Sequence, residues 1–214
     1  MKKLQQLIQG HQEFQKLHHK QFAFEFDELV KKGQSPEILF IGCSDSRVVP
    51  DLITGSKPGD LFIIRNVGNF VPPFREDNDF HGTAAGIEYA VSVLGIKHII
   101  VCGHSHCGAC ESLYHEIPEK KELVHVKKWL ELGNISKSFV EENFKTETKT
   151  EKIRLTEQVS VVFQLENLLT YPAVAKGIED GTITIHGWYY DLQTGVIKHF
   201  DTDTFEFKDL ISQK

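Results

Sequence analysis

Short, continuously apolar runs alternate with a segment of helical length in the first half of this 214-residue chain. Residues 38–41 and 60–65 predict two strands, residues 81–94 a buried helix that Gly95 ends, and residues 97–102 a third strand. Strands that are apolar on both faces are typical of parallel sheets covered by helices. The sequence therefore predicts an α/β fold with a mostly parallel central β-sheet flanked by helices.

An N-terminal helical arm is predicted ahead of this core. Apolar side chains recur at helical spacing from Leu4 to Val30, and Gly33 ends the pattern. No internal repeat or low-complexity linker divides the rest of the chain. We therefore expect a single domain over residues 1–214, made of an arm at 1–33 and an α/β core at 34–214.

The second half of the chain predicts more helix and then more strand. Residues 119–180 read as a helical region, in which we interpret the polar stretch 136–152 as a solvated face or a flexible connection. Residues 182–190 and 196–200 predict two strands joined by a turn at 193–195. These strands would complete the sheet.

Charge and hydropathy exclude several classes of partner. Lys and Arg total 24 against 30 Asp and Glu, and no polybasic run is present, so we expect no nucleic-acid partner. No stretch approaches the roughly 20 apolar residues of a membrane-spanning helix. The first ten residues lack the apolar core of a signal peptide, so we expect a cytoplasmic protein with reduced cysteines.

Two polar segments carry the residues that suggest chemistry. Cys43 follows the first predicted strand, and His104 and Cys107 follow the third. Ligands of parallel sheets bind at the carboxyl ends of the strands, so these three side chains can converge there. Two thiolates and an imidazole suit zinc, and a three-ligand zinc site keeps one position open for a water molecule, as catalytic sites do.

The residues alone leave alternatives open. His106 competes with His104 as a ligand, and Cys107 with Cys110 forms a Cys-x-x-Cys pair that could be a redox dithiol or half of a structural zinc site. Cys102 lies within an apolar strand and is interpreted as a small core residue. The spacing does not choose between these assignments.

The chain resembles the β-class carbonic anhydrases. The resemblance rests on Cys-Ser-Asp-Ser-Arg at 43–47, followed about sixty residues later by His-x-x-Cys-Gly at 104–108. It extends over most of the chain from about Gln34 onward, through four further segments: residues 57–60, 65–69, 84–91 and 186–190. It implies a zinc enzyme that interconverts carbon dioxide and bicarbonate, with one Zn²⁺ per chain.

The resemblance also implies roles for individual residues. The zinc ligands would be Cys43, His104 and Cys107, and the catalytic dyad would be Asp45 and Arg47. In the family the substrate pocket lies at a dimer interface, where the partner subunit contributes the glutamine and the tyrosine and the N-terminal helices embrace that partner. A homodimer is implied, or a dimer of dimers. The substrate-binding residues would be Gln34, Phe62, Val67, Gly68, Tyr89 and Gly108.

Two departures from the family pattern limit what the resemblance implies. The bicarbonate-regulated branch has a tryptophan at the position of Phe40, beside the equivalents of Arg65 and Tyr190, and a phenyl ring has no N–H donor. We therefore favour the plant-like, constitutively open branch. Some plant members have a proton-shuttling histidine where this chain has Val93, so the proton would leave by another group or directly to buffer.

Two other functions compete with carbon dioxide hydration. Relatives of this fold hydrolyse carbon disulfide or carbonyl sulfide, and the entrance to the site would decide between these substrates. A non-catalytic zinc or thiol-redox protein that uses Cys107 and Cys110 is the alternative from another class. Metal content together with thiol titration would distinguish a catalytic site from that alternative.

Overall fold

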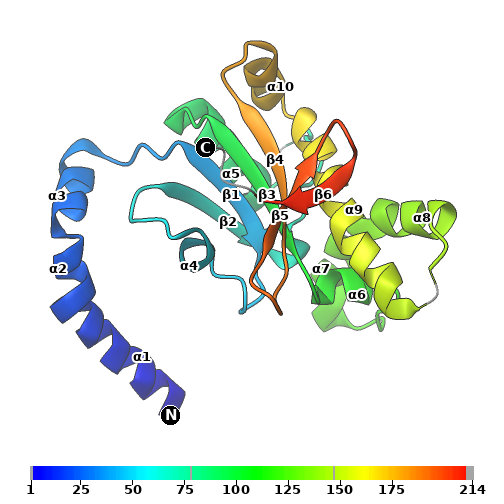
Figure 1. Cartoon of the computed structure of the whole chain (residues 1–214), viewed down its shortest axis with the longest axis horizontal. Coiled ribbons are helices and arrows are strands. Elements are labelled where there is room, and N and C mark those ends of the chain that lie inside the picture. The colour runs from blue at the N-terminus through cyan, green and yellow to red at the C-terminus, as the bar shows by residue number, and fades with distance from the viewer. Residues whose placement is uncertain (1, 78, 147, 211–214) are drawn as a thin grey trace.

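A six-stranded sheet forms the centre of the computed structural model, which describes residues 2–77, 79–146 and 148–210. The strand order is β2-β1-β3-β4-β5-β6, in which the first four strands are parallel and the last two are antiparallel to their neighbours (Figure 1). The predicted mostly parallel sheet is therefore confirmed. The strands are β1 (Ile38–Cys43), β2 (Leu61–Asn66), β3 (His98–His104), β4 (Thr184–Tyr190), β5 (Ile197–Asp201) and β6 (Glu206–Asp209).

Helices pack on the sheet and precede it. In the described part of the chain, no helix is both long enough and apolar enough to cross a bilayer. The α-helices are α1 (Lys2–Glu13), α2 (His19–Gln21), α3 (Ala23–Lys32), α4 (Pro50–Thr54), α5 (Gly82–Glu88), α6 (Gly108–Ser112), α7 (Val124–Leu130), α8 (Asn134–Asn143), α9 (Lys149–Leu169) and α10 (Pro172–Glu179). Two π-helical turns, η1 (Phe14–His18) and η3 (Tyr89–Leu94), extend α1 and α5.

The main core lies between one face of the sheet and the helices α5, α9 and α10. Apolar residues of β1 and β3 that face these helices, such as Leu39 and Ile99, are fully buried. They pack against Ile87 of α5, Val161 of α9 and Val174 of α10. Residues on the opposite face of these strands, including Phe40, Ile100 and Cys102, form a second buried cluster. Both faces of β1 and β3 are therefore covered, which explains why their sequences are continuously apolar.

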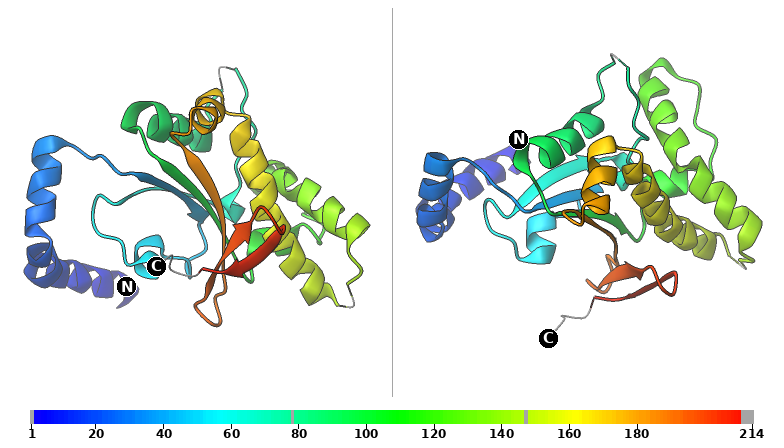
Figure 2. Two further views of the ribbon diagram at one scale, coloured as in Figure 1. Left: turned by 45° about the horizontal axis from the view of Figure 1, so that its top comes forward. Right: turned by 90° about the horizontal axis from the view of Figure 1, so that it is seen from above.

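The N-terminal arm is helical and ends as predicted at Gly33, whose φ of 81° only glycine adopts readily. None of the described residues of its helices is buried. Figures 1 and 2 show the arm reaching away from the sheet, joined to β1 by residues 33–37. Within one chain its apolar side chains are therefore largely uncovered: Leu4, Leu7, Ile8, Leu17, Phe24 and Val30 are all more than half exposed.

The polar stretch 136–152 is more ordered than the sequence suggests. Its first part belongs to α8, in which Ser136 and Val140 are fully buried. Its last part opens α9 with a capping box, in which Thr148 Oγ1 accepts the backbone N–H of Glu151 and a Glu151 oxygen accepts the N–H of Thr148. The interpretation as a flexible connection is wrong for these two parts, because α8 packs against α9.

The predicted helix at 81–94 is confirmed, but it is not buried on all sides. Ile87 and Ala90 face the core, whereas Ala85 is exposed, Tyr89 is 45% exposed and Val93 is 65% exposed. These three residues are spaced four apart, so they form one stripe along the helix. A sequence pattern cannot distinguish burial within a chain from burial against another chain.

The short elements α4, α6 and β6 were not predicted.

Candidate metal centre

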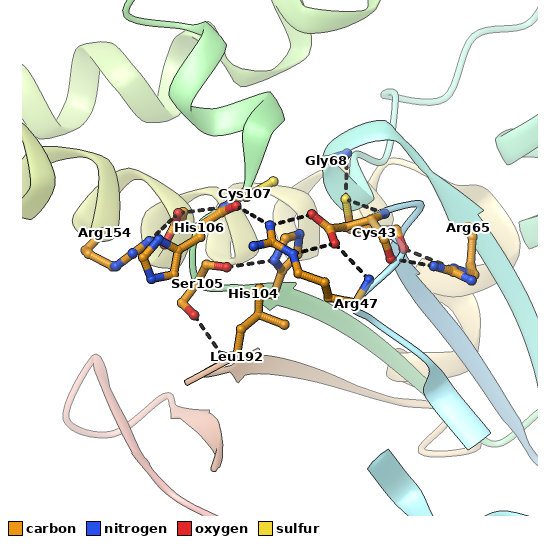
Figure 3. Close-up of polar contacts among 12 residues, drawn as sticks. Cys43, Arg47, Arg65, Gly68, His104, Ser105, His106, Cys107, Arg154 and Leu192 are labelled. Atoms are coloured by element: carbon orange, nitrogen blue, oxygen red, sulfur yellow. Dashed lines mark hydrogen bonds and ion pairs between the residues drawn. The ribbon is translucent and has the colours of Figure 1, made fainter. Parts of the chain in front are cut away.

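Two loops meet at the carboxyl ends of β1 and β3. These strands are parallel neighbours, and their register pairs Gly42 with Cys102, so Cys43 and His104 both end up at the same edge of the sheet. The loop after His104 turns sharply at His106, whose φ of 57° lies in the left-handed region. This turn places Cys107 beside His104 and Cys43 (Figure 3). The two sulfur atoms and an imidazole nitrogen lie within 4.8 Å of one another, and all three residues are buried.

The ring of His104 is held in the tautomer that a metal requires. Its Nδ1 lies 2.9 Å from the carbonyl oxygen of Ser105, so Nδ1 carries the proton and donates it. Its Nε2 is buried and has no hydrogen-bond partner among the described residues. His106 is exposed, and only His104 joins the cysteines. An unpartnered buried lone pair beside two sulfur atoms fits a metal ion.

The thiols of Cys43 and Cys107 both have raised pKa values. Cys43 Sγ accepts the backbone N–H groups of Asp45 and Gly68, each at 3.4 Å. Hydrogen bonding with Cys107 and then burial raise the pKa of the Cys43 thiol to about 12. Contact with the Cys110 thiol, followed by burial, raises the pKa of Cys107 as well. Both thiols keep their protons near neutral pH until a cation displaces them, as zinc does when it binds sulfur.

The carboxylate of Asp45 is locked by Arg47. Its Oδ1 accepts the backbone N–H and the Nε–H of Arg47, both at 2.9 Å, and its Oδ2 accepts Nη2–H at 2.8 Å. The Arg47 guanidinium thereby holds the pKa of Asp45 well below its usual range. Arg47 Nη2 also donates to the carbonyl oxygen of His106 at 3.0 Å, which ties the two loops together.

Two contacts that support the site were not predicted from the sequence. Arg65 donates to the carbonyl oxygens of Cys43 and Asp45 at 3.0 and 2.7 Å, and so braces the first loop from β2. Glu157 of α9 accepts the backbone N–H of Cys107 at 2.9 Å. A charged residue inside the apolar pattern of a helix was the available signal for Glu157, but nothing in the sequence relates it to a loop fifty residues away.

The predicted substrate-binding residues fall into two groups within one chain. Gly68 lies against Cys43 Sγ, Val67 precedes it, and Gly108 follows Cys107, so these three are close to the metal ligands. A side chain at Gly68 would lie 2.9 Å from Ala109 Cβ, which explains the glycine.

Gln34, Phe62 and Tyr89 form the other group. Gln34 is exposed and precedes the amino end of β1, whereas Cys43 lies at its carboxyl end. Phe62 pairs with Leu39, the second residue of β1, and packs against the half-exposed Tyr89 with ring centroids 5.9 Å apart. The structure does not bring these three residues to the metal ligands of their own chain.

The remaining cysteines lie outside the ligand set. Cys102 is fully buried in the apolar face of the sheet, as predicted, and burial raises its pKa to about 12. Cys110 is buried one helical turn after Cys107 but does not belong to the group of converging ligand atoms.

Comparison with known proteins gives one consistent result. Residues 38–197 match a family model described as carbonic anhydrase. A carbonic anhydrase of Synechocystis sp. is 40% identical over 206 residues, which cover 95% of this chain and 73% of that protein. A carbonic anhydrase of Pseudomonas aeruginosa is 42% identical over 179 residues, covering 83% and 79% of the two chains.

Solved structures agree with the sequence matches. The β-carbonic anhydrase CcaA superimposes with a TM-score of 0.92 at 38% identity, over 100% of this chain and 94% of that one. One of two tetrameric β-carbonic anhydrases from Sordaria macrospora gives a TM-score of 0.82 at 30% identity, over 93% and 97% of the two chains.

The converging side chains lead to a prediction about metal content. We expect Cys43→Ala, His104→Ala and Cys107→Ala each to lose bound zinc, because two ligands hold the ion far less tightly than three. Cys110→Ser should retain about one zinc per chain, since its thiol lies outside the group. Elemental analysis of the purified variants measures this. Equal zinc loss in Cys110→Ser would instead indicate a structural Cys-x-x-Cys site.

Proposed function

The chain belongs to the β-class carbonic anhydrases, and we propose that Cys43, His104 and Cys107 hold its zinc ion. It is a zinc-dependent enzyme that interconverts carbon dioxide and bicarbonate. The observation that carries the assignment of ligands is the buried His104 Nε2, which has no partner among the described residues and faces two sulfur atoms. Neither carbon disulfide nor carbonyl sulfide hydrolysis is favoured by the relatives.

Asp45 and Arg47 are proposed as the catalytic dyad. When bound, zinc makes a water molecule acidic enough to supply the nucleophile near neutral pH. Asp45 stays ionised at the pH of catalysis, because Arg47 bonds both of its oxygens. As a fixed acceptor, it can take a hydrogen bond from the attacking oxygen and direct a lone pair at the carbon atom of carbon dioxide. Arg47 keeps Asp45 in that position.

The substrate pocket is proposed to be completed by a second subunit. Val67, Gly68 and Gly108 would line it from the chain that holds the metal ligands. Gln34, Phe62 and Tyr89 would line the pocket of the partner. Their position away from their own Cys43, together with the exposure of Gln34 and Tyr89, supports this division. Gln34 would donate its amide N–H to bicarbonate, and the two rings would give the pocket an apolar wall.

We assign the uncovered apolar surfaces to a homodimer. The arm exposes leucines along α1, and the stripe Ala85–Tyr89–Val93 borders an open groove of about 500 Å³ between α5, η3 and α10. Exposed apolar area of this kind is typical of interfaces between subunits. Two such dimers would form a tetramer, the state named for the Sordaria macrospora proteins. We also propose a cytoplasmic location, where the four free cysteines stay reduced and the enzyme serves carbon utilization.

The plant-like, constitutively open branch is proposed for this enzyme. Phe40 is fully buried and packs edge-on against Trp188, and it offers no N–H donor for a regulatory bicarbonate. The guanidinium of Arg65 already donates to two backbone carbonyls. These contacts support a dyad that stays paired without an effector.

Stopped-flow measurement of carbon dioxide hydration tests the function and the dyad together. The wild-type protein should be active, lose activity with its zinc to a chelator, and recover when zinc is restored. Asp45→Asn should keep its zinc but lose about a hundredfold or more in kcat/KM, because an amide cannot act as the same fixed acceptor. Zinc-loaded protein without hydration activity would refute the function, and wild-type turnover in Asp45→Asn would remove Asp45 from the mechanism.

The arm can be tested with two matched triple substitutions in α1. Replacing Leu4, Leu7 and Ile8 by glutamate should shift the protein from dimer toward monomer, because it places charges on the proposed apolar contact. Replacing Gln5, Gln6 and Gln9 by glutamate adds the same charge and should leave the dimer intact. Light scattering after size-exclusion chromatography gives the masses, with 24.4 kDa expected for a monomer. A wild-type monomer, or two equally dimeric variants, would contradict the assignment.

The pH dependence follows from the charges of the ligands. Two thiolates and a neutral imidazole cancel the formal charge of zinc, so activity should rise through an apparent pKa above the roughly 7 of a three-histidine site. The loss at lower pH should not come from Asp45, whose pKa is lowered and which stays ionised there. The pH profile of hydration at several bicarbonate concentrations measures this.

Two outcomes of that measurement would contradict us. Activity that stays at its maximum below about pH 6.5 would refute the charge argument. A steep, cooperative loss that deepens with bicarbonate would place the enzyme in the regulated branch despite Phe40.

A further inference from the structure

One peptide unit in the second loop is held from both sides. The carbonyl oxygen of His106 accepts Arg47 Nη2–H at 3.0 Å (Figure 3). The N–H of Cys107, at the other end of the same peptide unit, donates to Glu157 Oε1 at 2.9 Å. A cation therefore bonds the acceptor and an anion bonds the donor of one peptide. Charged groups make the stronger hydrogen bonds, and bonds at both ends of a peptide reinforce each other.

Glu157 is itself fixed by three donors. It is 2% exposed, and its two oxygens accept Arg154 Nη1–H at 2.8 and 2.9 Å. Its Oε2 also accepts the hydroxyl of Tyr189 at 2.7 Å. With the N–H of Cys107, these bonds compensate a carboxylate that would be costly to bury alone. The side chain thus has little freedom to leave the loop.

Two glycines allow α9 to bring Glu157 to this position. A Cβ at Gly103 of β3 would lie 2.5 Å from Val161 Cγ2, and one at Gly187 of β4 would lie 3.0 Å from Val161 Cγ1. The bare backbone at Gly103 lets the helix approach the strands this closely, and a side chain at Gly187 would make a tight contact with the same valine. Glu157 lies one helical turn before Val161, at the end of the strands where the second loop begins.

We propose that Glu157 is a positioning residue that acts through the His106–Cys107 peptide on both the Cys107 thiolate and Arg47. This rests on the proposed roles of Cys107 and of the Asp45–Arg47 dyad. His106 has left-handed backbone geometry that non-glycine residues adopt reluctantly, so the peptide needs external bonds to keep its orientation. Without the acceptor on its N–H, the peptide can rotate, which moves Cys107 Sγ and withdraws the carbonyl from Arg47.

The matched control comes from the same helix. Gln164 is fully buried in α9, and its Oε1 accepts the backbone N–H of Val71 at 2.7 Å. Gln164→Leu and Glu157→Leu each remove one buried side-chain acceptor from a backbone N–H. Only Glu157→Leu removes it from the loop that carries a metal ligand.

The experiment measures the rate at which zinc-loaded protein transfers its zinc to a chromogenic chelator. We expect Glu157→Leu to release zinc about tenfold to a hundredfold faster than wild type, the range seen when partners of metal ligands are removed. Glu157→Gln, which keeps a carbonyl acceptor for Cys107 N–H, should restore most of the wild-type rate. Gln164→Leu should lower the melting temperature but leave the release rate within about twofold. In cobalt-substituted protein, the thiolate-to-metal absorption band should change in Glu157→Leu alone.

The zinc-release rates of the variants decide whether Glu157 positions the loop. Zinc release at the wild-type rate in Glu157→Leu, or equal acceleration in Gln164→Leu, would overturn the proposal while leaving hydration and its ligands intact. If Glu157→Leu does not fold, Arg154→Met provides the test, because it frees the same carboxylate and should accelerate release severalfold. Wild-type protein that holds no zinc would instead contradict the proposed function.

Discussion

The parallel pairing of β1 with β3 determines where the chemistry can occur. Its register places Cys43 and His104 at one edge of the sheet, and the turn at His106 adds Cys107. Each strand ends in a loop whose backbone is braced by a cation from elsewhere. Arg65 of β2 holds the carbonyls of the first loop, and Arg47 joins the first loop to the second. The sheet thus brings the ligands together, and arginines fix their final positions.

The other supports come from elements distant in sequence. α9 can supply Glu157 only because Gly103 and Gly187 admit the helix close to the strands. Trp129 of α7 donates its indole N–H to the carbonyl of Val67 at 2.7 Å, beside the Gly68 N–H that reaches Cys43. One helix of the second half of the chain therefore holds the loop that carries Cys107, and another holds the segment after β2 whose Gly68 contacts Cys43 Sγ. The immediate environment of Cys43, His104 and Cys107 draws on both halves of the chain.

The sequence predicted the parts of this arrangement that depend on local pattern. The apolar strands, the arm up to Gly33 and the convergence of Cys43, His104 and Cys107 could be inferred because sheet geometry constrains them. Glu157 could not, since its contact depends on the rotation of α9 and on how closely the helix packs. The helix at 81–94 was predicted to be buried, yet its Ala85 is exposed, because the 3.6-residue period records which face is covered and not by which chain.

The charges around the site balance in two different ways. With zinc bound, the two thiolates, Asp45 and Glu157 would carry four negative charges. Zinc would supply two positive charges, and Arg47 and Arg154 supply one each. Without the metal, the raised pKa values of Cys43 and Cys107 keep both thiols protonated, and the two carboxylate–arginine pairs remain balanced. Buried charge is costly when it is unpaired. The group of Cys43, His104 and Cys107 is therefore close to neutral in both states, because two thiol protons leave when the ion binds.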